Sequence, residues 1–268
     1  MNIPKITIVT PSYNQGQYLE RTILSVLCQE YPALEYIIID GGSTDNSVEI
    51  IRRYADRLNY WHSAPDKGQA DAIARGFELA TGDILGWLNS DDMLMPNALI
   101  NVANAFLATR GICAVIGRCV VINAEGKPFG VNIPIIRSWR AMLYLGTGFA
   151  QMATFWQKSA YHAVGQLDSA MYFSFDADLF VRLKKYGEFK LIPNYLSAYR
   201  SHKASKTSNS PHIMRTENCA ILQRYTNASG FIIELSHIAK RLRPIRRIRN
   251  KLFWYRDKHK LVELCRVG

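Results

Sequence analysis

The short apolar run Ile84–Leu88 is followed directly by an amide and two adjacent carboxylates, in the segment Leu88–Asp92 (LNSDD). Carboxylate and amide oxygens are preferred ligands of hard divalent cations such as Mg2+ and Mn2+, which also hold phosphate groups. The apolar run reads as a buried strand, and parallel α/β sheets bind ligands at the carboxyl ends of their strands. The segment therefore predicts a site for a metal and a diphosphate. The alternative is that Asp91 or Asp92 caps a helix beginning near Pro96.

Small and polar residues also follow three earlier apolar runs. These segments are Thr10–Asn14 (TPSYN), Asp40–Asp45 (DGGSTD) and Pro65–Gln69 (PDKGQ). Each alone is compatible with ordinary turn chemistry, but their recurrence at successive strand ends favours a shared nucleotide pocket. The phosphate loops of dinucleotide dehydrogenases and P-loop NTPases are missing, because no GxGxxG follows the first strand and no GxxxxGK(S/T) occurs. A nucleotide held by carboxylates and a metal is the prediction that remains.

Four segments together resemble the family 2 glycosyltransferases, which have a GT-A fold that binds nucleotide-diphospho-sugars. The matching segments are IVTPSYNQGQYL, IIIDGGSTDNS, DKGQADAIARG and GWLNSDD, in the family's order and spacing. The resemblance covers residues 5–205. It implies an inverting, metal-assisted sugar transfer from a nucleoside-diphosphate sugar, with a UDP-sugar as the favoured donor, in polysaccharide biosynthesis. The implied acceptor is a hydroxyl of a glycan or of a lipid-linked acceptor.

The resemblance also implies roles for residues on the donor side. A nucleoside pocket and its sugar-proximal edge would be formed by Thr10, Pro11, Tyr13, Asp40, Lys67 and Asp71. Asp40 would hydrogen-bond the base, whereas Lys67 and Asp71 would lie near the base or the sugar.

Within LNSDD, Asp91 resembles the metal-facing member of the family's DxD motif, and Asp92 would reach the donor sugar or the metal. Asn89 stands where the motif has its first Asp. Ser90 lies between Asn89 and Asp91 and would also face the donor. The neutral amide removes one charge, so Mn2+ or Mg2+ is expected to bind mainly together with the nucleotide.

On the acceptor side, the segment Ser174–Leu179 (SFDADL) resembles the family's E-D-x-D-L segment, with Phe175 in place of the Glu. Asp176 matches the general base of inverting members. An attacking hydroxyl must lose its proton as the new bond forms, and a positioned carboxylate that accepts it accelerates such reactions by typically 10²–10⁴-fold. Asp178 is predicted to be a structural cap for a helix that follows it.

Two further segments resemble parts of the family. The late loop beginning at Arg200 would close over the donor diphosphate, with His202 as a metal ligand and Arg200 or Lys206 contacting phosphate. A solvated side chain is the alternative for His202. Trp156 ends the segment Gln151–Trp156 (QMATFW), which resembles the family's acceptor-side strand, and would stack on a sugar. Aromatic residues in such runs, including Trp87 and Trp139, are more often core residues.

The elements that must position these groups alternate between strand and helix patterns. Helical stripes begin near Leu19, Asp45 and Ala70, and a further helix begins near Pro96. The expected strands are Lys5–Thr10, Glu35–Asp40, Leu58–Ser63, Ile84–Leu88, Cys113–Ile122 and Phe189–Ile192. This pattern predicts an α/β fold whose mainly parallel, Rossmann-like sheet is flanked by helices. We divide the chain into a GT-A glycosyltransferase domain over residues 1–212 and a helical, basic and amphipathic extension over residues 213–268.

Composition and charge limit the remaining classes. The 268 residues are 48% hydrophobic and 21% charged, which excludes disordered and fibrous chains. Five cysteines without a CxxC pair suggest reduced thiols. No apolar window is long enough to span a membrane and no secretory signal precedes the first strand. We therefore expect a cytoplasmic protein, either free or peripheral on the cytoplasmic face of the membrane.

The net charge of +11 is concentrated at the carboxyl end, where residues 237–268 hold eleven Lys and Arg against two acids. Pro244 is expected to restart a helix there. An apolar stripe of Ile238, Leu242, Ile245, Ile248 and Leu252 lies among these cations. An apolar ridge flanked by cations is typical of a helix on an anionic membrane surface. Packing on the domain is the alternative, and nucleic-acid binding is disfavoured because no recognition motif accompanies the charge.

Two other functions stay open from the residues. A nucleotidyltransferase would use a similar metal and nucleotide pocket but release pyrophosphate, and the lack of a basic, Gly-rich loop after the first strand argues against it. A non-catalytic protein recruited to a membrane or to nucleic acid would bind no nucleotide sugar.

Overall fold

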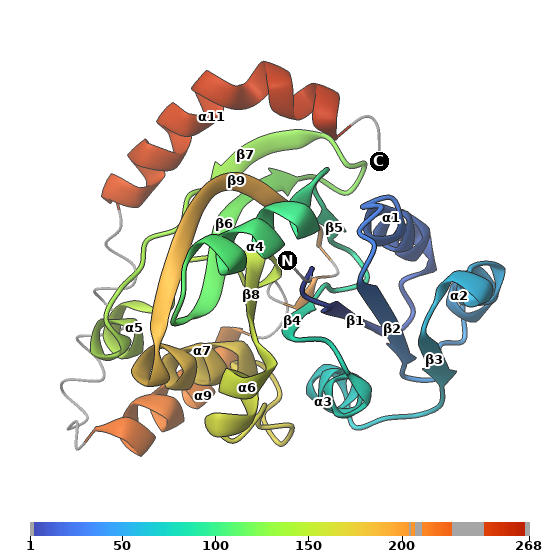
Figure 1. Cartoon of the computed structure of the whole chain (residues 1–268), viewed down its shortest axis with the longest axis horizontal. Coiled ribbons are helices and arrows are strands. Elements are labelled where there is room, and N and C mark those ends of the chain that lie inside the picture. Colours follow the sequence, from blue (N-terminus) through green and yellow to red (C-terminus); the bar gives the residue numbers. More distant parts are fainter. Residues whose placement is uncertain (1–2, 204, 207–210, 227–243, 266–268) are drawn as a thin grey trace.

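The computed structural model describes residues 3–203, 205–206, 211–226 and 244–265. Within these residues a nine-stranded sheet runs in the order β3-β2-β1-β4-β8-β6-β9-β5, and β7 pairs with β6 outside this path (Figure 1). The strands are β1 Ile6–Ser12, β2 Leu34–Asp40, β3 Tyr60–Ser63, β4 Ile84–Trp87, β5 Met93–Leu94, β6 Ile112–Ile122, β7 Pro128–Asn132, β8 Thr154–Gln157 and β9 Glu188–Arg200.

The first half of the sheet is parallel and places its strand ends together. β1 pairs in parallel with β2 and β4, and β2 with β3, so that Ser12, Asp40 and Ser63 lie side by side at one edge. β1 and β4 are buried along their whole length, as the apolar runs predict. The second half is mixed, because β8 runs antiparallel to both β4 and β6, while β6 and β9 are parallel. The predicted α/β class, with a mainly parallel sheet flanked by helices, is confirmed.

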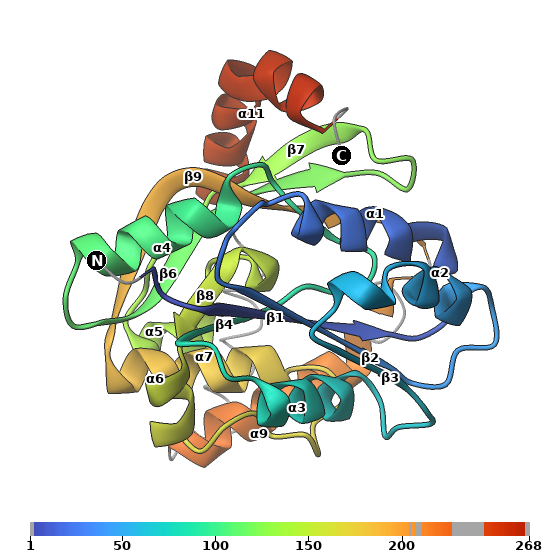
Figure 2. The ribbon, with the colours of Figure 1, turned by 45° about the vertical axis from the view of Figure 1, so that its right-hand side comes forward.

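Helices cover both faces of this sheet. α1 and α2 lie over one face of β1–β3, and α3 lies over the other (Figure 2). The helices are α1 Gly16–Leu27, α2 Ser47–Arg53, α3 Gln69–Leu79, α4 Ala98–Ala108, α5 Trp139–Leu145, α6 Lys158–Ala163, α7 Phe175–Tyr186, α9 Pro211–Tyr225 and α11 Pro244–Leu264, with 3-10 turns at Ala55–Arg57 and Gln151–Ala153.

Several boundaries differ from the predictions. α2 begins at Ser47, two residues after Asp45, and Asn46 rather than Asp45 directly precedes the helix. β9 runs to Arg200, well past the predicted Ile192, because it pairs with β6 through register shifts around Arg118. The short strand β5 separates LNSDD from α4, and that helix begins after Asn97. Neither Asp91 nor Asp92 is therefore a helix cap.

The carboxyl-terminal helices contact the rest of the molecule. Ile221 and Leu222 of α9 are buried in the same core as α3 and α7. α11 begins at Pro244, as predicted, and lies along β7 (Figure 1). Ile238 and Leu242 of the predicted stripe lie outside the described residues, and the division at residues 212 and 213 stays a prediction. All five cysteines lie within the described ranges and are free thiols. None of the described helices combines the length and apolar character needed to cross a bilayer.

Candidate active site

The loops after β1 and β2 fasten each other at the carboxyl edge of the sheet. The Asn14 side-chain oxygen accepts a hydrogen bond from the Thr44 amide (2.8 Å), and Asp45 accepts one from the Gly16 amide (2.9 Å). Asn14 has a φ of 50°, in the left-handed region that Asn tolerates well. Burial raises the pKa of Asp45, but hydrogen bonds from Ser47 and Gly16 outweigh it and lower that pKa. This edge of the sheet is therefore held in one shape before any ligand arrives.

Asp40 serves this edge as a structural residue. Its side chain is 0% exposed and accepts hydrogen bonds from the amides of Gly42 and Ser43 and from the hydroxyls of Ser43 and Ser63. A carboxylate enclosed in this way cannot also reach a nucleotide base. The predicted contact of Asp40 with the base is corrected: Asp40 shapes the Gly41–Ser43 loop.

The other predicted donor-side residues differ in accessibility. Thr10 is buried and its hydroxyl lies 3.1 Å from that of Tyr36, and Pro11 is buried within β1. Neither side chain can line a pocket, so these two assignments are corrected to support of the strand. The Tyr13 ring is 62% exposed beside them. Such an exposed aromatic ring is free to stack on a planar group.

Lys67 and Asp71 lie together at the start of α3. The Lys67 side chain is exposed, and its amide donates to the Asp71 carboxylate (3.1 Å). Asp71 also forms an ion pair with Arg75 (2.8 Å). The Lys67 ammonium group is therefore exposed at the edge of the site, whereas the Asp71 carboxylate is occupied by the Lys67 amide and Arg75.

The LNSDD segment is held by a polar network. The Asn89 amide nitrogen lies 3.3 Å from Asp92, and its oxygen accepts a hydrogen bond from the Gln69 side chain (2.7 Å). Thr22 on α1 donates to the carbonyls of Ser90 (2.9 Å) and Asp92 (2.7 Å). The Ser90 side chain is buried, so Ser90 supports the turn rather than meeting the donor through its hydroxyl.

Asp92 points into the molecule. It is 1% exposed and accepts a hydrogen bond from the Arg200 amide (2.9 Å). Burial, and then the neighbouring Asp91 charge, raise the pKa of Asp92 well above its ordinary value. Asp92 therefore joins the LNSDD turn to β9, and its predicted contact with the donor sugar or the metal is corrected.

Asp91 and His202 meet across a long sequence separation. The His202 Nε2 atom lies 3.0 Å from the Asp91 carboxylate, and the His202 ring packs beside Tyr18 at 4.9 Å between centroids. Asp91 is the more exposed of the two side chains. The structure thus brings together the two residues predicted to face a metal.

This pair fits a cation that is shared with a phosphate ligand. Across the described ranges, no group of three or more His, Cys, Asp or Glu side chains forms a complete metal cage. Mg2+ is usually held by one or two protein carboxylates together with substrate phosphates and water, and imidazole accompanies carboxylate at many transition-metal sites. Asp91 and His202 supply one oxygen and one nitrogen of that kind.

Arg200 and Trp156 are core residues, which corrects both predictions. The Arg200 guanidinium is fully buried and donates to the carbonyls of Asp91 (2.8 Å) and Ala124 (2.9 Å), with Tyr18 below it. It therefore has no face for a phosphate. Trp156 is fully buried among aromatic rings, 5.4 Å from Trp87, and cannot stack on a sugar. Trp87 and Trp156 are therefore core residues, which is the alternative given above for aromatic residues in such runs.

Asp176 lies in the first turn of α7, partly buried. Phe175 beside it is anchored in the core against Trp87, which fixes the start of the helix. Burial raises the pKa of Asp176 to about 6, against a backbone hydrogen bond from Ala177 and the charge of Lys206, which both lower it. A carboxylate with such a pKa is deprotonated near neutrality and basic enough to accept a proton.

Glu217, to which the motifs assign no role, and Lys206, predicted only to contact phosphate, both act on Asp176 through their charge. Glu217 on α9 accepts hydrogen bonds from three successive amides, those of Tyr172, Phe173 and Ser174 (2.7, 2.8 and 2.6 Å). It therefore fixes the loop that leads into α7. Lys206 lies over the Tyr172 ring at 4.1 Å.

Gln69 joins the two halves of the site. Its oxygen accepts a hydrogen bond from Lys206 (3.2 Å), while its nitrogen donates to Asn89. Gln69 stands inside the motif DKGQAD, so its place at a strand end was a usable signal. Glu217 stands in no motif, and nothing in the sequence indicated it.

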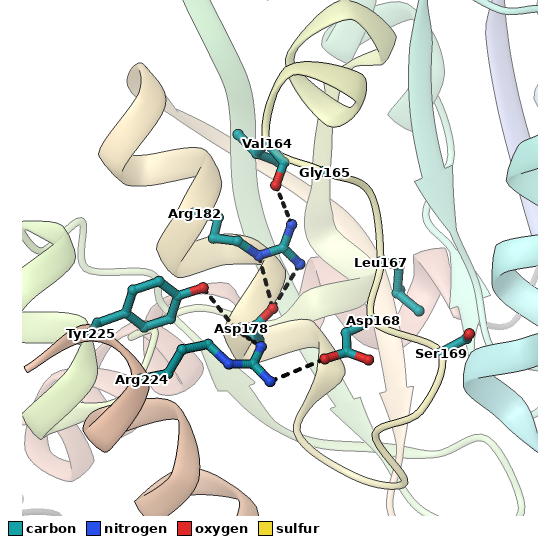
Figure 3. Close-up of a pocket in the computed structure, with 9 residues that line it drawn as sticks. All are labelled: Val164, Gly165, Leu167, Asp168, Ser169, Asp178, Arg182, Arg224 and Tyr225. Carbon is teal, nitrogen blue, oxygen red and sulfur yellow. Dashed lines mark hydrogen bonds and ion pairs between the residues drawn. The ribbon is translucent and has the colours of Figure 1, made fainter.

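Asp178 lies two positions along α7 and therefore on another side of the helix from Asp176. It is fully buried, and it accepts hydrogen bonds from Arg182 (2.8 Å), Arg224 (3.2 Å) and Tyr225 (3.1 Å). These groups line an open cavity of about 420 Å3 (Figure 3). Since α7 begins at Phe175, Asp178 is not a cap; its role is structural, as predicted, in tying α7 to α9.

Comparison with known proteins gives a family match. The model of the family described as glycosyl transferase family 2 matches residues 7–165. An uncharacterized glycosyltransferase of Haemophilus influenzae is 41% identical over 130 residues, which cover 47% of this chain and 52% of that protein. Chondroitin synthase of Pasteurella multocida is 30% identical over 193 residues, covering 70% of this chain and 20% of the synthase. The chain thus spans about half or less of the length of these relatives.

Solved structures share the fold. S. aureus TarS 1-349 in complex with UDP-GlcNAc superposes with a TM-score of 0.62 at 14% identity, covering 87% of this chain and 70% of that one. The mannosyltransferase PcManGT from Pyrobaculum calidifontis, in complex with GDP-Man and Mn2+, gives a TM-score of 0.62 at 17% identity, covering 90% and 70%. At these identities the likeness concerns the fold alone.

Proposed function

The chain belongs to glycosyl transferase family 2, and on that premise we propose that it is an inverting glycosyltransferase. The proposed donor is a nucleoside-diphosphate sugar, with a UDP-sugar favoured, and the acceptor is a hydroxyl of a glycan or a lipid-linked acceptor in polysaccharide assembly. The observation that carries the proposal is the contact between Asp91 and His202 (3.0 Å) at the strand ends. Asn89 of the same LNSDD segment is linked through Gln69 to Lys206, whose charge acts on Asp176. Chondroitin synthase and the UDP-GlcNAc and GDP-Man complexes named above support the substrate class.

On the donor side, the exposed Tyr13 ring would meet the base, and the exposed Lys67 would lie beside the sugar or the phosphates. Asp91 and His202 would hold Mn2+ or Mg2+, which when bound would neutralise the charge of the departing nucleoside diphosphate. Lys206, an ammonium group lying between Gln69 and Tyr172, would add a positive charge near the same leaving group.

On the acceptor side, Asp176 would accept the proton of the attacking hydroxyl. The new bond forms between the acceptor oxygen and the anomeric carbon while the bond to the diphosphate breaks on the opposite face, so the configuration inverts. The hydroxyl proton passes to Asp176, and the bonding electrons leave with the diphosphate. A pKa of about 6 suits this step, because the carboxylate is already deprotonated at neutral pH.

A nucleotidyltransferase is the second candidate, and it has no comparable support. Attack on the α-phosphate would assign no role to Asp176, whose pKa is raised to about 6. A binding protein without activity would likewise need no carboxylate of raised pKa beside the nucleotide edge.

The test compares two variants, each of which must first be shown to fold like the wild type. We expect Asp176→Asn to lower kcat by about 10²–10⁴-fold and to leave donor binding, measured by calorimetry, nearly unchanged. Asp91→Ala should weaken binding of the nucleotide sugar in the presence of Mn2+. Full turnover by the Asp176→Asn variant, or a product with retained anomeric configuration by NMR, would remove Asp176 as the base.

A further inference from the structure

Helix α11 packs on the body of the protein through one of its sides. The Asn250 side-chain oxygen accepts a hydrogen bond from the Ile133 amide (3.2 Å), and Asp257 accepts one from the Tyr195 hydroxyl (2.8 Å). The inward side consists of Asn250, Phe253, Trp254, Asp257 and Leu261. Residues spaced three and four positions apart lie on one face of a helix. Contacts of this face hold α11 against the body of the protein, and the opposite face points outward.

The outward side carries large apolar residues. Ile248 is 60% exposed, Leu252 66% and Tyr255 57%. They are spaced four and three residues apart, which places them in one ridge along the helix. Figure 1 shows α11 at the periphery of the molecule, along β7. An apolar ridge on an outer helix is a common mark of an interaction surface.

Cations flank this ridge on both sides. At about 100° per residue, Arg247, Lys251 and Lys258 lie along one flank, and Arg256 and Lys260 along the other. The Lys251 and Lys258 ammonium groups lie 5.9 and 5.8 Å from the centre of the Tyr255 ring. By the same rotation, Glu263 lies on the outward side beyond the ridge, at the carboxyl end of the described part of α11, whereas Asp257 faces inward.

We propose that this outward face of α11, defined by Ile248, Leu252, Tyr255 and the flanking cations, docks on an anionic lipid bilayer with the helix axis in the membrane plane. The apolar ridge would enter the headgroup boundary, and the cations would meet lipid phosphates at its sides. A nucleic acid would match the cations but not the ridge, whereas a bilayer matches both. The proposal concerns where the protein binds and does not depend on the transferase activity.

The test measures sedimentation of the full chain with vesicles of phosphatidylcholine, with and without phosphatidylglycerol. We expect binding to the anionic vesicles and much weaker binding to the neutral ones. The double variant Ile248→Ser, Leu252→Ser should lower the partition coefficient by at least about tenfold, and Lys251→Gln with Lys258→Gln by about tenfold at low salt.

Matched controls lie elsewhere on the surface. Leu107→Ser removes an exposed leucine from α4, and Arg52→Gln with Arg57→Gln removes two exposed cations near α2; neither should alter vesicle binding. Equal binding to neutral and anionic vesicles, or unchanged binding by the Ile248 and Leu252 variant, would overturn the proposal. Binding to duplex DNA that equals vesicle binding and ignores the apolar substitutions would overturn it as well.

Discussion

At the scale of single residues, the surroundings of Asp176 make its protonation sensitive to two neighbours of opposite charge. Burial raises its pKa to about 6, the Lys206 ammonium lowers the pKa, and the Glu217 carboxylate raises it. For a base, activity is present above this pKa and lost as the pH falls through it. We therefore expect the acidic limb of kcat/KM against pH near pH 6.

Two substitutions should move that limb in opposite directions. Lys206→Met removes a positive charge and should shift the limb to higher pH, whereas Glu217→Gln removes a negative charge and should shift it to lower pH. Both variants would also lower kcat, so the position of the limb, rather than the rate, is the measurement. Shifts of both variants in the same direction would contradict the assignment of Asp176 as the titrating base.

The raised pKa of Asp176 also has a consequence for stability. Because the folded pKa of about 6 exceeds the ordinary value of 3.8, the charged form is disfavoured in the folded state. Asp176→Asn should therefore increase the free energy of unfolding at pH 8 by on the order of 1–3 kcal/mol. The gain should vanish below about pH 4, where the carboxyl is protonated in both states. Denaturant unfolding at the two pH values measures it, and a variant less stable than the wild type at pH 8 would argue against a strained carboxylate.

The direction in which each side chain points was the hardest feature to predict from the sequence. The motifs correctly indicated that Asp91 and His202 belong to one place, although 111 positions separate them. The same motifs suggested ligand contacts for Asp40 and Arg200, which are enclosed by backbone amides and carbonyls instead. Spacing along a strand places a residue at an edge of the sheet, but whether its side chain holds a loop or faces a ligand depends on partners from distant segments.

At the scale of elements, the four strands of the parallel half were predicted from short runs bounded by turn residues, and the runs of β1 and β2 are rich in β-branched residues. In the second half, β6 was predicted as Cys113–Ile122, but β9 was predicted only over Phe189–Ile192, since the two strands pair through irregular registers that leave no simple period in the sequence. Asp178 was predicted to cap α7, whereas the helix begins three residues earlier, at Phe175, which packs in the core.

Helix α9 supports α7 through buried charge, which can be tested by stability. Asp178 is fully buried and pairs with Arg182 and Arg224. Asp178→Asn should lower the free energy of unfolding by about 3 kcal/mol, because it removes the buried carboxylate that pairs with Arg182, a cation whose side chain is only 16% exposed.

The matched control is Asp168→Asn, which breaks only the more exposed pair with Arg224 (3.2 Å). It should cost less than about 1 kcal/mol. Equal losses of stability in urea unfolding for the two variants would show that Asp178 does not hold α7 to α9.

At the scale of the whole molecule, the net charge of +11 separates into two parts with different meanings. Residues 1–236 carry only +2, and their informative charges are acids at strand ends and on α7. The basic residues gather at the carboxyl end, where α11 presents cations and an apolar ridge outward. Composition alone predicts only a basic protein. The distribution of charge along the chain separates the acidic residues of the candidate active site from the basic surface of α11.

The central claim, sugar transfer from a nucleoside-diphosphate sugar, is tested most directly by a donor screen. The full chain is incubated with UDP-, GDP- and dTDP-sugars, Mn2+ and a glycan acceptor, and the released nucleotide is identified. We predict acceptor-dependent release of a nucleoside diphosphate from at least one donor, with UDP favoured, and its loss in the Asp176→Asn variant. Release of pyrophosphate, or release that the Asp176→Asn variant leaves unchanged, would contradict the account.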